Sequence, residues 1–190
     1  TSIEENEMFA TLRFGTPIDL RRSILGKLNI SIGRNAYEYY LTDNFTSYDL
    51  PDISGINFVA PSFILEKNNT NYRIYPTEGM NQRLTVGYTF MSSDYKPGST
   101  SEEMTPINEK INHRFKARFS SEVYYPINKW FTLGSIIDFT VSNNIIFADY
   151  ISTLISLPAF QPNPHSKTLL IKGYRAPTYL AAGVNPIIRI

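Results

Sequence analysis

The stretch that decides the fold spans residues 113–141 and reads HRFKARFSSEVYYPINKWFTLGSIIDFTV. It contains two runs of alternating apolar and polar residues, separated by the turn-forming segment PINKW. Side chains of an extended strand alternate between two faces, so Phe115, Phe119 and Val123 share one face of the first run. The other face carries the charged residues Lys116, Arg118 and Glu122. The pattern predicts a β-hairpin whose charged face meets water, either outside a soluble sheet or inside a membrane barrel.

The composition excludes several functional classes. The net charge of +1 gives no electrostatic reason to expect a nucleic-acid partner. The chain has no cysteine, so neither a disulfide framework nor a thiolate metal site can form within it. Its two histidines, His113 and His165, are far apart in the sequence and have no ligand partners at metal-binding spacing. We therefore expect neither a metal site nor a cofactor.

The apolar segments are too short for transmembrane helices. None approaches the roughly 18 consecutive apolar residues that mark a spanning helix. The acidic start TSIEENEMF lacks the basic and apolar regions of a signal peptide. Aromatic residues make up 14% of the chain, and this enrichment favours strands, because aromatic rings pack well on pleated surfaces.

Alternation elsewhere in the chain predicts further long strands. Outside the opening hairpin, alternating runs occupy residues 7–16, 23–35, 56–68, 80–91 and 179–190. In the fourth of these strands Leu84 and Val86 lie on the apolar face. Most of the runs exceed the roughly 5 to 6 residues of an ordinary globular strand and match the roughly 9 to 11 that a tilted strand needs to cross a bilayer.

The predicted connections alternate between short and long. Long loops are expected at residues 36–55, 92–111 and 144–178, and short turns lie between them. In an antiparallel meander, alternate connections lie at opposite ends of the sheet, so one end carries tight turns and the other long loops. Outer-membrane barrels of bacteria show the same asymmetry.

Together these features predict an all-β fold, an antiparallel up-and-down transmembrane β-barrel segment that forms one incomplete domain over residues 1–190. About seven strands are expected, and because bacterial barrels have an even number, further strands should come from outside these residues or from another chain. A soluble β-sandwich that binds a ligand is the alternative. The residues expected to face lipid are Phe115, Phe119, Val123, Leu84 and Val86. Those expected to face the lumen are Lys116, Arg118, Glu122, Asp138 and Arg189. An aromatic girdle is expected from Tyr37, Tyr39 and Tyr40 at one membrane boundary and from Trp130 at the other.

Two segments resemble a known superfamily. The segment NNTNYRIYPTEGMNQRLTVGY, residues 68–88, resembles the turn and strand of BamA- and TamA-type surface-antigen barrels of the outer membrane. The segment HSKTLLIKGYRAPTYLAAGVNPIIRI, residues 165–190, is similar to the place where this superfamily carries an R-G-F/Y motif in its sixth extracellular loop. Here Lys172, Gly173 and Tyr174 stand at the motif, followed by Arg175, so lysine replaces the first arginine.

The combination FADY, LPAFQPNPHSKTLL and YRAPTYLAAGVNPIIRI is most similar to one branch, the barrel domain of patatin-like phospholipases of Bacteroidetes-type bacteria. The resemblance implies a barrel of roughly sixteen strands, of which this chain would supply a middle portion. It implies that the barrel anchors, or acts as a conduit for, a patatin-like lipid acyl hydrolase domain. The G-x-S-x-G nucleophile motif of such hydrolases does not occur in the chain, so we expect no catalytic residue within it. The alternative within the superfamily is a BamA-like barrel that assembles or translocates outer-membrane proteins.

The resemblance also implies the location and the partners. We expect the bacterial outer membrane, with its lipid and lipopolysaccharide, and the remaining barrel strands or other outer-membrane proteins. The long segment 144–178 combines apolar stretches with basic residues, which predicts a plug that folds into the barrel. Lys172 or Arg175 would then reach an acidic residue of the lumen, either Asp138 or Glu122.

Overall fold

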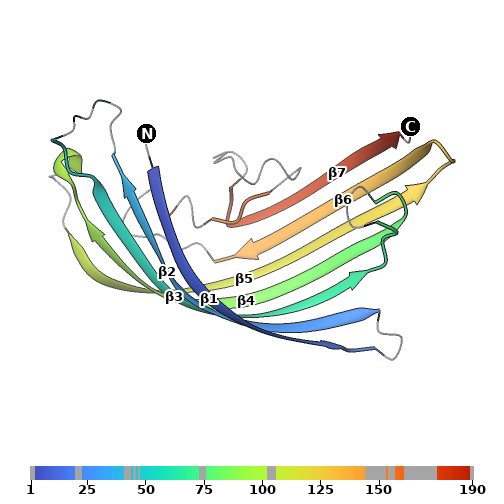
Figure 1. The fold of residues 1–190 in the computed structure, drawn as a ribbon, viewed down its shortest axis with the longest axis horizontal. Coiled ribbons are helices and arrows are strands. Elements are labelled where there is room, and N and C mark those ends of the chain that lie inside the picture. Colours follow the sequence, from blue (N-terminus) through green and yellow to red (C-terminus); the bar gives the residue numbers. More distant parts are fainter. Residues whose placement is uncertain are drawn as a thin grey trace.

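The chain forms one antiparallel sheet in which every strand pairs with its neighbours in sequence order. This computed structural model describes residues 3–19, 23–40, 44, 46, 48–72, 76–101, 106–143, 153, 157–160 and 175–188. The strands are β1 (Ile3–Pro17), β2 (Ile24–Tyr39), β3 (Asp52–Asn68), β4 (Gly79–Lys96), β5 (Ile107–Pro126), β6 (Phe131–Ser142) and β7 (Thr178–Ile188) (Figure 1). A short 3-10 helix, η1 (Ser99–Ser101), lies between β4 and β5. The prediction of an all-β, up-and-down meander with seven strands is confirmed.

The decisive stretch forms the hairpin of β5 and β6. Phe119 pairs with Phe139 in the register, and the strands turn back over residues 127–130. Asn128 holds this turn, because its side-chain oxygen accepts hydrogen bonds from the backbone nitrogens of Trp130 (2.8 Å) and Phe131 (2.9 Å). An asparagine that binds the backbone two and three residues ahead stabilises a tight turn locally.

Two of the predicted long loops are shorter than expected. β2 runs to Tyr39 and β3 begins at Asp52, so the loop predicted at 36–55 shrinks to residues 40–51. The loop predicted at 92–111 shrinks to 97–106, because β4 and β5 continue to pair through Ser93 and Lys110. Residues 92–96 carry polar side chains on both faces and so lack the alternation that predicts a strand, whereas the backbone ladder continues regardless of side-chain polarity.

The third predicted loop, 144–178, falls mostly outside the described residues, and its last residue, Thr178, belongs to β7. The expected sorting of connections by length therefore holds only in part. The connection between β3 and β4 covers residues 69–78, so it is as long as the one at 97–106 at the other end of the sheet.

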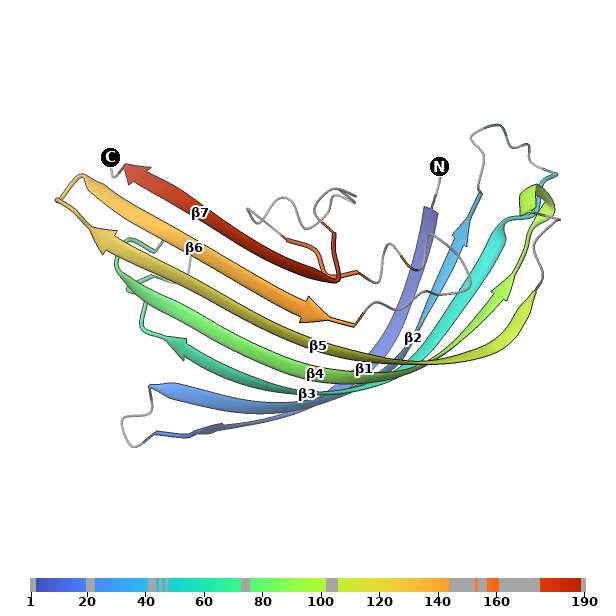
Figure 2. The same ribbon diagram turned by 180° about the vertical axis from the view of Figure 1, so that it is seen from behind.

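The sheet is curved into an open trough (Figures 1 and 2). β1 and β7 are its two edges, and each pairs with only one of the described strands. The parts of the β6–β7 connection at 157–160 and 175–177 lie on the concave side, where the Tyr179 hydroxyl donates to the Ala159 carbonyl over 3.3 Å. The side of the sheet that carries Tyr179 is therefore the concave one. No helix among the described residues has the length and apolarity needed to span a membrane.

One turn depends on the backbone freedom of glycine. Gly79, at the start of β4, has a φ of +100°, and a Cβ atom there would lie 2.5 Å from the Asn69 carbonyl oxygen. Gly183 in β7 is the opposite case, since a Cβ atom there would meet nothing within 4 Å.

We expect Gly79→Ala to lower the free energy of unfolding by about 1–3 kcal/mol, because it combines a strained backbone with a steric clash. Gly183→Ala should change that free energy by less than about 1 kcal/mol. Urea unfolding of the two variants beside the unsubstituted protein measures both values. Equal stability of the two variants would contradict the turn geometry.

Candidate functional site: the two faces of the sheet

The convex face of the sheet is apolar across all seven strands. Register pairs connect Leu84 to Phe119, Phe119 to Phe139 and Phe139 to Leu180, so one apolar row crosses β4 to β7. A parallel row connects Phe14 to Leu28, Phe63 and Val86 across β1 to β4. All five residues predicted to face lipid, Phe115, Phe119, Val123, Leu84 and Val86, have this parity.

This face is exposed rather than packed against another layer. Phe119 is 37% exposed in the middle of β5, and Leu180 is 72% exposed on β7. The outward positions of β5 from Phe115 to Val123, and of β7 from Leu180 to Val184, carry no Asp, Glu, Lys or Arg. Monomeric soluble proteins rarely expose a contiguous apolar surface above a few hundred Å², so this face is a candidate contact surface.

The concave face is polar, and several of its charged side chains bind a charged or neutral polar neighbour. Arg13 donates from Nε to the Asn29 side-chain oxygen (3.0 Å), and Lys27 pairs with Glu66 (2.7 Å). Glu122 accepts a hydrogen bond from the Tyr124 hydroxyl (3.2 Å). Four residues predicted to face the lumen, Lys116, Arg118, Glu122 and Asp138, share this parity, whereas Arg189 lies outside the described residues.

The strongest polar contact on the concave face joins β5 to β6. The Arg118 guanidinium donates from Nε to one Asp138 oxygen (3.0 Å) and from Nη2 to the other. The Tyr179 hydroxyl, which has the Ala159 carbonyl as its other acceptor, lies 3.4 Å from the same carboxylate, and Asp138 is only 3% exposed. A bidentate guanidinium–carboxylate pair is both stronger and more directional than a single neutral hydrogen bond.

Asp138 therefore has a different basic partner from the one expected. The sequence suggested that Lys172 or Arg175 would reach Asp138 or Glu122, but Arg118 takes the bidentate position at Asp138. The Arg175 guanidinium donates to the Leu157 carbonyl (3.3 Å), and the backbone at Arg175 forms a bridge with Ala159. Lys172, Gly173 and Tyr174 lie outside the described residues.

Two of the tyrosines predicted for the girdle lie on the concave side of the sheet. Tyr37 and Tyr39 are 3% and 1% exposed, and in the register they pair with Ser54 and Asp52 on the concave side. Buried inward rings cannot lie at the level of lipid headgroups on the outer surface. Tyr40 lies just beyond β2, and its hydroxyl donates to the Asp49 carbonyl (3.3 Å).

Exposed aromatic rings do occur at the opposite end of the sheet, which carries the connections 18–23, 69–78 and 127–130. Trp130 is 59% exposed beside the β5–β6 turn, and the Lys129 ammonium lies 5.3 Å from the centre of its ring system. Tyr125 and Tyr72, at the same end, are 71% and 62% exposed. The membrane boundary at this end stays a prediction, and the exposure of these three rings agrees with it.

At the end of the sheet that carries the connections 40–51 and 97–106, the long-loop end, a buried carboxylate joins these two connections. Asp52 has no exposed surface and accepts hydrogen bonds from the Tyr95 hydroxyl (3.0 Å), the Gly98 nitrogen (2.9 Å) and the Ser101 hydroxyl (2.8 Å). A Cβ atom at Gly98 would lie 2.2 Å from the Leu50 carbonyl oxygen, so the two loops can approach only because this residue is glycine. This contact closes the start of the β4–β5 connection onto the base of β3.

Comparison with known proteins identified no relative: no protein-family model, curated protein or solved structure matches the chain. Among the described residues, no group of three or more His, Asp or Glu side chains could hold a metal ion. The two faces of the sheet are therefore the candidate functional surfaces.

The Arg118–Asp138 pair can be tested with a double-mutant cycle. We expect Arg118→Ala, Asp138→Ala and the double variant to give a coupling free energy of about 1–3 kcal/mol, because the carboxylate is buried and the contact is bidentate. The Lys27–Glu66 pair is the matched control; it has one contact, and its side chains are 22% and 25% exposed. Its coupling should be below about 1 kcal/mol. If urea unfolding gives equal coupling free energies for the two pairs, the Arg118–Asp138 contact is not the stronger of the two.

Proposed function

We propose that the chain is a sector of the wall of a transmembrane β-barrel in the bacterial outer membrane. The convex face contacts lipid, and the concave face lines a water-filled interior. The observation that carries the proposal is the position of the two faces: the apolar side chains are on the outside of the curve and the polar side chains on the inside. This is the side-chain arrangement of outer-membrane barrels.

Energetics support the assignment of the convex face to lipid. Apolar surface that stays in water costs roughly 25 cal/mol of free energy per Å² relative to buried surface. The exposed apolar face extends over seven strands. Contact with acyl chains removes this cost without a second protein layer. The strands, from 11 residues in β7 to 20 in β5, are long enough to cross the hydrocarbon core, which takes roughly 9 to 11 residues.

A closed barrel needs more strands than the sheet contains. The edges β1 and β7 carry backbone groups that no described strand satisfies on the outer side. Each unsatisfied group costs several kcal/mol in hydrocarbon, so both edges must pair with further strands, in a barrel of roughly sixteen. These strands, together with membrane lipid and lipopolysaccharide, are the partners that the proposal requires.

Within this class we propose a surface-antigen type of barrel that serves as anchor and conduit for a patatin-like hydrolase domain. The support is the sequence resemblance of residues 68–88 and 165–190. The chain itself contributes no G-x-S-x-G motif, so the sector binds and positions rather than catalyses. If every serine nucleophile outside residues 1–190 is replaced and the protein still hydrolyses lipid esters, the assignment of catalysis to another domain is contradicted.

The absence of cysteine from the chain permits a direct test of the two faces. We expect Ser120→Cys on the concave face to react with a membrane-impermeant maleimide that enters the barrel from water. Phe119→Cys, its neighbour on the convex face, should react only after detergent removes the bilayer. Labelling is read by mass spectrometry, with the unsubstituted protein as the blank. Equal labelling of both positions in intact vesicles would contradict the proposal.

A second pair of variants tests the same assignment through insertion. Val184→Arg places a charge on the convex face at the middle of β7 and should cost about 2–4 kcal/mol near the bilayer midplane. Asn185→Arg, one residue further and on the concave face, should insert normally. Both positions are exposed in the sheet, so a difference cannot arise from crowding. The readout is the fraction of protein resistant to alkaline extraction from membranes, and equal fractions would contradict the assignment.

A further inference from the structure

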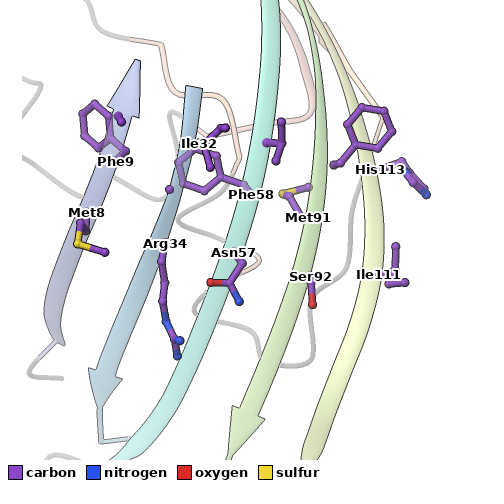
Figure 3. Close-up of a pocket in the computed structure, with 14 residues that line it drawn as sticks. Met8, Phe9, Ile32, Arg34, Asn57, Phe58, Met91, Ser92, Ile111 and His113 are labelled. Atoms are coloured by element: carbon purple, nitrogen blue, oxygen red, sulfur yellow. The ribbon is translucent and has the colours of Figure 1, made fainter. Parts of the chain in front are cut away.

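The convex face is hollowed where its apolar region ends, towards the long loops. A groove of about 820 Å³ crosses β1 to β5 at this level (Figure 3). Two adjacent rows of outward side chains form most of its lining, and Phe9, Phe58 and Met91, which have the opposite parity, complete it. The row nearer the middle of the sheet is apolar and consists of Ala10, Ile32, Val59 and Phe90. The next row consists of Arg34, Asn57 and Ser92 and is flanked by Met8 and Ile111.

The walls of the groove are apolar at both ends. Met8 on β1 is 75% exposed and Ile111 on β5 is 68% exposed. On the β5 side, the ring of His113 packs edge-on against Phe90, with 5.5 Å between the ring centres. The groove therefore offers an apolar trench along one row and a polar margin along the other. Its volume lies in the range of pockets that bind small ligands, about 300–1,000 Å³.

Arg34 supplies the only full positive charge in the lining of the groove. Its side chain is 53% exposed, and its Nη2 atom lies 4.0 Å from Asp94, the outer limit of an ion pair. A Cβ atom at Gly55 would lie 3.0 Å from this guanidinium, so the arginine can lie along the surface because residue 55 has no side chain. With a single long contact to Asp94, most of the guanidinium donors remain available to a ligand at the polar margin.

We propose that this groove binds a phosphorylated acyl lipid of the leaflet on the long-loop side. An acyl chain lies along Ile32, Val59 and Phe90, and the phosphate is held by Arg34 with Asn57 beside it. The inference rests on the proposed membrane function and names a specific ligand for one part of the lipid-facing surface.

Two features select a lipid as the occupant. The groove straddles the boundary between the apolar and polar parts of the convex face, which is the level at which a lipid changes from acyl chain to headgroup. Guanidinium donors match the oxygens of a phosphate in charge and in planar geometry. A protein segment would need polar partners for its backbone along the whole groove, but the row of Ile32, Val59 and Phe90 offers none.

The test uses the full protein reconstituted in phosphatidylcholine vesicles that contain bacterial lipid A, a phosphorylated, multiply acylated lipid. After detergent extraction, native mass spectrometry measures the lipid A retained. Arg34→Gln should reduce retention about tenfold, as expected from the loss of one charge-assisted contact. Arg83→Gln, which removes a positive charge from the concave face, is the control and should leave retention unchanged. Equal retention by the Arg34 and Arg83 variants would overturn the proposal.

A second pair of variants tests the acyl part of the groove without changing charge. Val59→Trp fills the apolar row of the groove and should also reduce the retention of lipid A. Leu180→Trp, on the convex face of β7, should leave that retention unchanged. Dephosphorylated lipid A should be retained no better by the unsubstituted protein than by Arg34→Gln. Retention of the dephosphorylated form at the level of lipid A would overturn the role of the phosphate. Displacement of lipid A by equimolar inorganic phosphate would overturn the role of the acyl chain.

The same samples separate this inference from the proposed function. Maleimide labelling that alternates between Phe119→Cys and Ser120→Cys shows that the sheet is inserted. Alternating labelling together with equal lipid retention by all variants overturns the lipid site alone. Loss of the alternation overturns the membrane assignment, and the lipid site with it.

Discussion

The backbone hydrogen bonds between adjacent strands are the constraint on which the rest of this structure depends. Each strand pairs with its neighbours in sequence through a nearly continuous ladder, in which the β3–β4 register skips Ala60 and Pro61 and the β4–β5 register shifts between Ser93 and Tyr95. A fixed register holds the parity of every side chain, so a slip by one residue would move all the apolar side chains of a strand to the concave face. The two-faced character of the sheet is therefore a property of the register. The tight turns protect it, as the Asn128 turn between β5 and β6 illustrates.

The curvature decides how each face can be stabilised. On the concave side, side chains from different strands converge, so charged groups there can reach partners, as Arg118 does with Asp138 and Tyr179. On the convex side, side chains diverge and cannot cover one another, which is why residues as large as Phe119 and Leu180 stay exposed. The fully buried side chains of the described residues include Thr132 and Asp52, and polar groups at such sites need partners within the protein. The Thr132 hydroxyl donates to the Thr77 carbonyl (3.1 Å), and the Asp52 carboxylate accepts three hydrogen bonds.

The sequence predicted the strands well because strict alternation is a local signal. It also separated Lys116 and Arg118 from Phe119 onto opposite faces, as the register has them, since parity follows from counting. Counting alone does not select the Arg118–Asp138 pair, because Arg118 lies opposite Thr140 in the register and Asp138 lies opposite Ser120, so the contact is diagonal. For Tyr37 and Tyr39, the parity that they share with Asn35 pointed inward, but the prediction followed their aromatic character instead.

Other features depended on contacts that no local pattern carries. The strand ends beyond the apolar region, such as Ser92 to Lys96, read as loops because polarity on both faces removes the period of two. The burial of Asp52 arises from three donors that are more than 40 residues away along the chain, and nothing near Asp52 in the sequence indicates them. The groove beside Arg34 likewise requires five strands to be in register before its two rows can be recognised.

The shape of the sheet also bears on the alternative of a soluble β-sandwich. A sandwich packs the apolar faces of two sheets about 10 Å apart, and the side chains of the two inner faces interdigitate across that layer. Here all seven strands belong to one sheet, and its apolar face is the convex one. A second sheet would have to wrap around the outside of the curve, with its own apolar face concave, to cover Phe14, Phe119 and Leu180 together. A fluid layer of acyl chains meets a convex surface without any such matching of shape, and the polar concave face then encloses water instead of a hydrophobic core.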